Sequence, residues 1–328
     1  MRSLTRIAIV AILALTLIAG AWIWLASRPP ERAEPARIEV TAGTPVRALA
    51  ARLEEAGVIR SARLFEIWVR ASGNAGSIQA GTYDFPPGIA LSAVIEMVLG
   101  GRTLLASVTI PEGLRLEQQA GVAARQLGID SAAFVAAATD SLLADSLGID
   151  AATLEGYLFP ETYLVDPKTD ARQLVRLMVG EFQRTFGEEW RERAEELGRS
   201  VREIVTLASI VEEEARVKEE RPVIAGVYWN RLRIGMKLEA DPTVQFALGA
   251  HRQRVLYRDL EIDSPYNTYL YPGLPPGPIA SPGRASLEAT LYPDSVPWLF
   301  FFATGEGGRH TFSQTFAEHN RKRRELNR

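Results

Sequence analysis

The sequence predicts an α+β protein in which an apolar N-terminal helix precedes a small mixed module and a larger, mostly helical domain. Three observations lead to this prediction. The 328 residues, 47% hydrophobic and 23% charged, have globular composition and suffice for about two folded units. Residues 7–26 contain no charged side chain. Short β-rich and helical stretches alternate to about residue 110, after which helical periodicity dominates.

The N-terminal apolar segment is long enough to cross a bilayer. Ile7–Ala26 has 20 residues, which as a helix span a hydrocarbon core of about 30 Å. Trp22 and Trp24 lie near its end, where indole rings favour the membrane interface. We therefore predict that residues 1–27 form a cytoplasmic tail and a transmembrane anchor, and that the chain beyond Ser27 is exported.

A cleavable signal peptide is the alternative for this segment. Arg2 and Arg6 precede the apolar run, and Ala19-Gly20-Ala21 resembles a cleavage site. The run continues past that site to Leu25, which favours a retained anchor.

Composition excludes several classes of function. The formal charge of −3 excludes a strongly basic nucleic-acid binder, so no nucleic-acid partner is expected. The absence of cysteine excludes disulfides and thiolate chemistry. His251, His310 and His319 share no ligand spacing, and no phosphate-binding or dinucleotide-binding loop is present. We therefore predict no metal and no cofactor, and carboxylates remain as the obvious chemistry. A Ser/His/Asp triad stays open, because triads are defined by geometry.

A small module follows a proline-rich, charged linker at residues 28–37. In this module, residues 38–105, Thr44-Pro45 is a predicted helix start, with Thr44 as the N-cap, and Ser61 caps a second helix. Leu64, Ile67 and Trp68 are expected on one face of that second helix. The predicted elements are helices over 46–56, 62–71 and 91–99 and β-rich segments over 79–85 and 104–110. Such a mixture suggests a binding or spacer module.

The larger domain, residues 106–328, is where we expect the chemistry. Helices are predicted over 116–127, 132–147 and 172–197, with 156–163 interrupting them. After Met236 the chain becomes loop-rich, and 267–283 is dense in proline and glycine. Long ordered loops in a compact domain usually line sites.

A glutamate-rich helix over 203–218 supplies the candidate acid. Ile204, Ala208, Val211 and Ala215 form its apolar stripe, and Glu213 points away from the stripe toward solvent. Glu214 follows Leu207, Ile210 and Val211 at helical spacing, whereas Glu212 follows Val205, Ala208 and Ser209. Aliphatic neighbours raise the pKa of a carboxyl group, as a general acid requires. Glu214 is therefore the preferred acid and Glu212 the reserve.

Each of these patterns also has a purely structural interpretation. The glutamates could form a surface patch that pairs with Arg216, Lys218 and Arg221. Asp241-Pro242-Thr243 is either a helix start or a set of hydrogen-bonding groups for a hydroxyl-rich ligand. Tyr266-Asn267 is either a turn or the aromatic and amide surface typical of saccharide sites. The residues alone indicate an exported, anchored enzyme that uses acidic groups on a polar polymer.

At these residues the sequence resembles the endolytic murein transglycosylase (MltG, YceG-like) family. The similar segments span nearly the whole chain, and their order and number are more specific than any one of them. They are 110–113, 155–163, 208–214, 230–236, 241–243, 266–269, 273–279, 281–283, 310–312 and 319–320.

The resemblance implies a single-pass inner-membrane protein whose LysM-like module leads into an α+β catalytic domain in the periplasm. Its substrate would be nascent peptidoglycan glycan strands, with the membrane and peptidoglycan synthases (penicillin-binding proteins) as partners. The reaction would cleave the β-1,4 bond between N-acetylmuramic acid and N-acetylglucosamine without water, leaving a 1,6-anhydro end. By alignment Glu214 would be the acid and then the base. Asn230, Asp241, Thr243, Tyr266 and Asn267 would bind glycan or orient the acid.

The chain departs from the family pattern at two positions beside the acid. Glu213 stands where Lys is expected, and Ala215 where a hydroxyl residue is common, which puts any role of that hydroxyl in doubt here. Two other functions stay open. A muramidase would need a second carboxylate, such as Asp241. A non-enzymatic cell-wall tether would not depend on Glu214.

Overall fold

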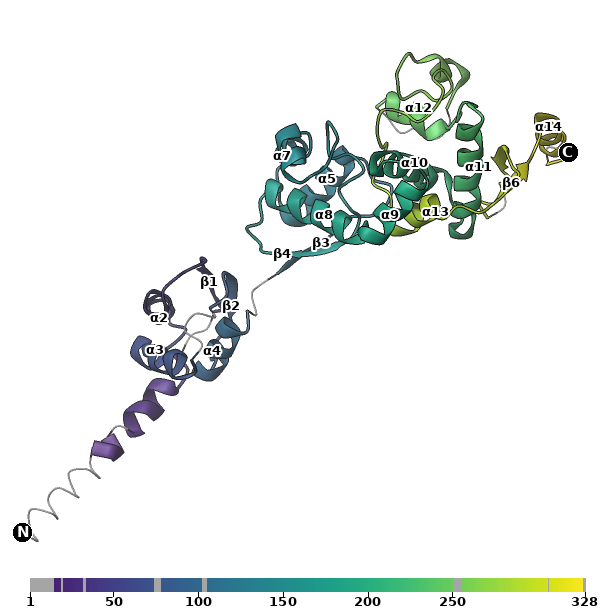
Figure 1. The fold of residues 1–328 in the computed structure, drawn as a ribbon. Coiled ribbons are helices and arrows are strands. Elements are labelled where there is room, and N and C mark those ends of the chain that lie inside the picture. The colour runs from purple at the N-terminus through teal and green to yellow at the C-terminus, as the bar shows by residue number, and fades with distance from the viewer. Residues whose placement is uncertain are drawn as a thin grey trace, which may run out of the picture. The chain divides into compact units, whose positions relative to one another are not determined.

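The computed structural model describes residues 15–18, 20–31, 34–73, 78–101, 105–249, 255–305 and 307–326. The chain divides into two compact units. Unit 1 comprises residues 1–106 with 164–168, and unit 2 comprises 107–163 with 169–328. Both contain helices and short strands, so the predicted α+β class is correct (Figure 1).

Unit 1 has the element order β1 (Ala36–Val40), α2 (Val46–Glu55), α3 (Ala62–Ala71), β2 (Gly81–Phe85) and α4 (Leu91–Leu99). The two strands pair antiparallel, with Ile38 opposite Tyr83. Both of these side chains are buried in a core that also takes residues from all three helices. The apolar residues that alternate along the strands and those at helical spacing along α2–α4 therefore pack into one core.

Two details of the predicted module differ in the structure. The N-cap of α2 is Pro45, because the Thr44 hydroxyl bonds Thr41 and does not cap the helix. Ser61 does cap α3, accepting from the Leu64 amide. On α3 the buried residues are Leu64, Phe65 and Val69, whereas Ile67 and Trp68 are exposed. The prediction grouped Ile67 and Trp68 with Leu64 on one apolar face. Only Leu64 of these three packs into the core, because the side of α3 that meets the core carries Leu64, Phe65 and Val69.

The predicted anchor lies partly outside the described residues. Residues 15–18 and 20–27 are helical, and Ala26 packs into the core of unit 1. Within the described part of the chain, no helix has both the length and the apolar character that a membrane span requires.

Unit 2 is mostly helical. Its elements are β3 (Ala106–Thr109), α5 (Leu116–Leu127), α6 (Ser131–Ala138), α7 (Ser141–Ser146), β4 (Thr162–Val165), α8 (Ala171–Thr185), α9 (Glu188–Glu196), α10 (Val201–Glu214), η1 (Lys218–Glu220), α11 (Arg221–Arg233), α12 (Asp241–Ala247), η2 (Tyr257–Glu261), α13 (Arg284–Leu291), β5 (Phe300–Ala303), β6 (His310–Ser313) and α14 (Phe316–Leu326). The first residue of β3, Ala106, and the last two residues of β4, Leu164 and Val165, are assigned to unit 1. β3 pairs with β4, and β5 with β6.

Two long predicted helices are each broken in two. The stretch 132–147 divides at Asp140, whose carboxylate caps α7 by accepting from the amides of Leu142 and Leu143. The stretch 172–197 divides at Phe186-Gly187, where Gly187 becomes the N-cap of α9. Polar caps and glycine interrupt a helix even where apolar periodicity continues.

Helix α10 is at the centre of unit 2. It packs against α9, α11, α12 and α13 (Figure 1). Eight of its residues, from Ile204 to Val211, are buried. A helix that is buried around its circumference holds its last turn firmly, and that turn carries the glutamates.

Candidate active site

Glu214 is the last residue of α10, where the apolar core meets solvent. The helix starts with a Ser200–Glu203 capping box and ends at Ala215, whose backbone is extended. The preceding side chains Leu207, Ile210 and Val211 are fully buried, as the sequence predicts. Glu214 itself is only partly exposed. The fold thus holds a carboxyl group against aliphatic packing and leaves it an opening to solvent.

A tyrosine from the next helix contacts this carboxyl group. The Tyr228 hydroxyl of α11 donates to Oε1 of Glu214 at 3.0 Å. Tyr228 is 1% exposed and meets Phe301 edge to face. Burial raises the pKa of Tyr228 well above its usual 10, so the phenol remains a donor throughout the physiological range.

The surroundings shift the pKa of Glu214 to about 7. Burial is the main cause, and the negative charges of Asp241 and Glu213 act in the same direction. The Tyr228 hydrogen bond and the charge of Arg231 oppose the shift. A carboxyl group with this pKa can both donate and accept a proton near neutral pH. The predicted desolvation of Glu214 is therefore confirmed.

Asp241 is the first residue of α12, and its charge acts on the Glu214 carboxyl group. It is exposed, and its Oδ1 accepts from the Tyr269 hydroxyl at 2.6 Å. The turn before it contains Glu239 at φ 50°, the one non-glycine residue with positive φ in the described ranges. Such a conformation is unfavourable for a residue with a Cβ atom, and it sets the direction in which α12 leaves the turn.

Arg231 holds that turn in place. It is 6% exposed, and its guanidinium donates to the carbonyl groups of Leu299, Lys237 and Leu238 at 2.6, 3.2 and 2.7 Å. A further contact of 3.4 Å joins it to the Glu239 carboxylate. One buried cation therefore ties α11, the 237–239 turn and the strand β5 region together and places positive charge near Glu214.

Glu212, the reserve acid, has a different environment. Its Oε1 lies 2.8 Å from Nη2 of Arg221, and both side chains are 7% exposed. Its Oε2 accepts from the Gly283 amide at 3.0 Å. Both oxygens are used within the protein, so Glu212 joins α10 to α11 and to the start of α13.

The surface-patch interpretation of the three glutamates holds only in part. Glu213 is exposed, as predicted. Of the three cations expected to pair with the glutamates, Arg221 does so, but with a buried partner. Glu214 makes no ion pair among the described residues.

Thr243 and Asn267 are fully buried, which does not fit their predicted contact with glycan. The Thr243 hydroxyl donates to the Ala240 carbonyl at 2.7 Å and lies 2.9 Å from the Thr268 hydroxyl. The Asn267 amide donates to the carbonyls of Leu260 and Ile262, both at 2.9 Å. These groups hold the 260–269 loop against α12 and position the exposed residues beside them.

Asn230 and Tyr266 are partly exposed. The Asn230 amide donates to the carbonyls of Val296 and Trp298 at 2.7 and 3.1 Å. It thereby fastens the segment that enters β5. The Tyr266 ring packs on Phe246 with 4.7 Å between centroids. Of the five residues predicted to bind substrate, Asp241 and Tyr266 are the ones whose side chains are best placed to meet a ligand.

Sequence reasoning missed three members of the site: Tyr228, Arg231 and Tyr269. Arg231 and Tyr269 lie in the similar segments 230–236 and 266–269, and Tyr228 lies two residues before the first of them, but only the neighbouring Asn230 and Tyr266-Asn267 were chosen. The missing signal is the pairing of helices, because Tyr228 is 14 residues after Glu214 and only the packing of α10 on α11 brings them together.

A second carboxyl group with a raised pKa lies in the same unit. Glu155 accepts the Leu116 amide on both oxygens, at 3.2 and 3.1 Å, and thereby covers the start of α5. Burial raises its pKa to about 7. Among the described residues, no cluster of three or more acidic or histidine side chains has the geometry of a metal site.

Comparison with known proteins places this arrangement in a family. The model of the YceG-like family matches residues 38–325. The chain belongs to the YceG-like family. Its match covers both units and includes all the site residues described above. The resemblance seen in the sequence motifs is therefore confirmed.

Characterised relatives carry one name. The YceG-like chain is 38% identical over 300 residues to the endolytic murein transglycosylase of Bacillus subtilis, covering 87% of this chain and 82% of that protein. It is 28% identical over 315 residues to the endolytic murein transglycosylase of Streptococcus pneumoniae D39, covering 87% of this chain and 57% of that protein.

A solved structure shares the fold. The crystal structure of a protein from Listeria monocytogenes, described as yceG-like, superimposes with a TM-score of 0.61 at 34% identity. The match covers 89% of this YceG-like chain and 100% of that one.

Proposed function

We propose that this protein is an endolytic peptidoglycan transglycosylase. It cleaves the β-1,4 bond between N-acetylmuramic acid and N-acetylglucosamine and leaves a 1,6-anhydro end. The observation that carries the proposal is Glu214: a partly exposed carboxyl group at the end of a buried helix, with a pKa of about 7 and one hydrogen bond from Tyr228. The relatives named endolytic murein transglycosylase support the substrate class.

One carboxyl group suffices for both proton transfers of this reaction. Protonated Glu214 gives its proton to the glycosidic oxygen as the bond from that oxygen to C1 of the muramoyl sugar breaks. The resulting carboxylate then takes the proton of the muramoyl 6-hydroxyl as its oxygen bonds to C1. Glu214 regains its proton, and no water is consumed. Tyr228 steadies the carboxylate between the two steps by donating to Oε1.

A muramidase is the second candidate, favoured by the closeness of Asp241. The charge of Asp241 raises the pKa of Glu214, so the two carboxyl groups interact. A hydrolase uses such a group to activate water or to attack C1. In the structure Asp241 accepts a hydrogen bond from Tyr269, and this contact would orient it for either role.

Product mass separates these functions. Purified glycan strands are digested with residues 28–328 and with the Glu214→Gln variant, and the products are weighed by mass spectrometry. Anhydro-muramoyl ends formed by the wild type alone are the expected result. Products heavier by one water indicate a muramidase, and no cleavage of nascent, uncrosslinked strands indicates a tether.

We also propose that residues 7–26 anchor the protein in the cytoplasmic membrane, with unit 2 outside the cytoplasm near peptidoglycan synthases. Exposed apolar side chains along residues 15–25, including Leu17 at 74% and Trp24 at 60%, support the anchor. The β1–α2–α3–β2 order of unit 1 is consistent with a LysM-like module. Membrane fractionation and protease digestion of intact spheroplasts test this: unit 2 is expected to sediment with membranes and to be digested from outside.

A further inference from the structure

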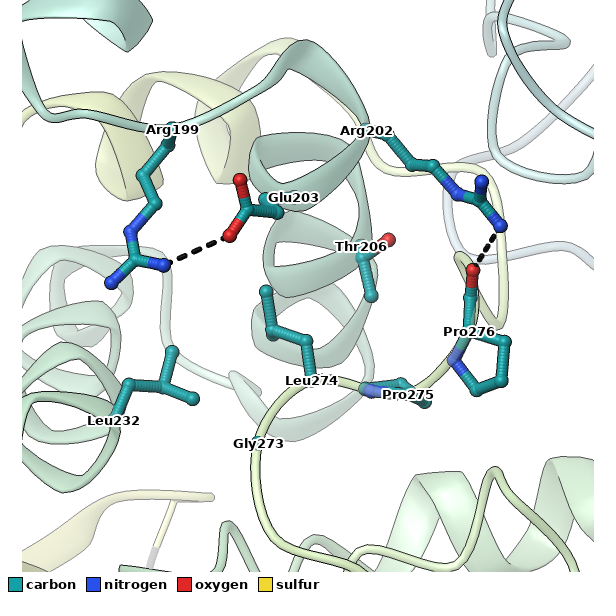
Figure 2. A pocket seen from close by; sticks show the side chains of 9 residues that line it. All are labelled: Arg199, Arg202, Glu203, Thr206, Leu232, Gly273, Leu274, Pro275 and Pro276. Carbon is teal, nitrogen blue, oxygen red and sulfur yellow. Dashed lines mark hydrogen bonds and ion pairs between the residues drawn. The ribbon is translucent and has the colours of Figure 1, made fainter. Parts of the chain in front are cut away.

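A hollow beside α10 lies outside the groups that the proposed reaction uses. Its volume is about 460 Å³, and Glu214 is not among the residues that line it. Figure 2 shows that the guanidinium groups of Arg199 and Arg202 flank the hollow on opposite sides. The lining residues are Arg199, Arg202, Glu203, Thr206, Leu232 and 273–276.

The two arginine side chains of this hollow differ in how many of their donors the protein already uses. Arg199 is paired with Glu203 at 2.8 Å and also lies over the Trp229 ring, 5.0 Å from its centroid. Arg202 is exposed and donates one N–H group to the Pro276 carbonyl. Since a guanidinium has five N–H donors in a planar fork, Arg202 keeps several for a ligand. Among the described residues that line the hollow, Arg202 is therefore the cation that has no carboxylate partner.

A threonine side chain lines the same space. Thr206 is 2% exposed as a residue and lines the hollow. Figure 2 shows this hydroxyl turned toward the Arg202 side. A hydroxyl group and a guanidinium that line one hollow can both donate to the same acceptor, and an anionic group is the acceptor that a guanidinium binds most strongly.

We propose that this hollow binds the C-terminal carboxylate of the peptide that muramic acid carries in peptidoglycan. The proposal rests on the proposed function for its substrate. Thr206 precedes Glu214 by eight residues of α10, or about 12 Å along the axis. Three to four extended peptide residues, at about 3.5 Å each, cover that distance. A peptide on the sugar at Glu214 can therefore extend to the hollow at Thr206, and the apolar wall of Leu232, Leu274 and Pro275 can receive its side chains.

The test compares glycan strands that bear peptides with strands from which an amidase has removed them. Arg202→Gln is expected to slow cleavage of the peptide-bearing strands about tenfold, through KM, and to leave the bare strands unaffected. Arg202→Lys, which keeps the charge without the fork, should fall between. Arg176→Gln, on the exposed face of α8, is the matched control for charge. An equal loss on both strands would show that Arg202 only holds the Pro276 loop, and no loss on either would also overturn the proposal.

Binding is measured separately, so that it does not depend on cleavage. Calorimetric titration uses the free peptide with its C-terminal carboxylate and the same peptide as an amide. We expect the carboxylate form alone to bind the wild type, and Arg202→Gln to abolish that binding. Equal binding of the two peptides, or none, would overturn the proposal even if strands are cleaved. Peptide binding without any strand cleavage would instead retain this site and reject the proposed transglycosylase.

Discussion

The Tyr228 hydroxyl lies 3.0 Å from Oε1 of Glu214 and donates to it across the interface of α10 and α11. This contact stabilises the ionised carboxyl group while burial destabilises it. The pKa of about 7 results from these two effects together with the charges of Asp241, Glu213 and Arg231. A transglycosylase that uses one group as acid and then base depends on that balance.

Removing the phenol should move the pH profile. In Tyr228→Phe the carboxylate loses a hydrogen bond, so the pKa of Glu214 rises above 7. Hydrogen bonds to charged groups contribute about 1.5–3 kcal/mol, which corresponds to at least one pH unit. We expect the alkaline limb of the kcat/KM profile for strand cleavage to move upward by about that amount.

Tyr163→Phe is the control for this change. Its hydroxyl donates to the Phe159 carbonyl and does not contact Glu214. An unchanged profile in Tyr228→Phe would mean that another group governs the alkaline limb.

Replacing the acid should stabilise the protein above neutral pH. The pKa of Glu214 is about 7 in the folded state, against an ordinary value of 4.5. Between these values the folded state binds the proton more firmly than the unfolded state, so stability falls as pH rises through this window. The difference corresponds to up to about 3 kcal/mol at pH 8. Glu214→Gln should therefore unfold at higher temperature than wild type at pH 8 and nearly alike at pH 4.5.

An exposed glutamate provides the comparison for that melting experiment. Glu192→Gln on α9 should change the unfolding temperature little at either pH. A Glu214→Gln variant that is no more stable at pH 8 would contradict the desolvation of this carboxyl group.

Glu212 is expected to be needed for stability and not for chemistry. Glu212→Ala removes the closer carboxylate of the buried Arg221, at 2.8 Å, and among the described residues leaves it only Glu112, at 3.8 Å. Breaking such a pair typically costs about 3–5 kcal/mol. Denaturant unfolding should show this loss, while cleavage per folded molecule, measured at low temperature, should stay within a few fold of wild type. A fully folded Glu212→Ala protein with no activity would restore Glu212 as the acid.

Two glycines test the packing beneath the site. Gly156 has φ 83°, and a Cβ atom there would lie 2.3 Å from Pro278. Gly148 has φ 70° and open space around it. Gly148→Ala should cost about 1 kcal/mol from backbone strain alone, and Gly156→Ala at least about 2 kcal/mol more because Pro278 must move. Denaturant midpoints of the two variants measure the difference. Equal losses of stability would show that the loop at Pro278 moves without an energetic cost.

The sequence by itself predicted several elements and favoured Glu214 over Glu212 as the candidate acid. Helical periodicity places α5 at Leu116–Leu127 and α4 at Leu91–Leu99 with the predicted bounds, because local apolar spacing and capping act within one segment. The contrast between the aliphatic neighbours of Glu214 and the smaller ones of Glu212 is also local, since i−3, i−4 and i−7 lie on the same helix.

Only the tertiary structure decided what each polar group contacts. Glu212 pairs with Arg221, and Glu214 accepts from Tyr228, because α11 packs against α10 with those side chains inward. Thr243 and Asn267 were predicted to meet a ligand, yet they are buried and hold the 260–269 loop. The spacing of residues along the chain predicts which side chains share a face of one helix or strand. Their hydrogen-bond partners depend instead on how separate helices and strands pack together.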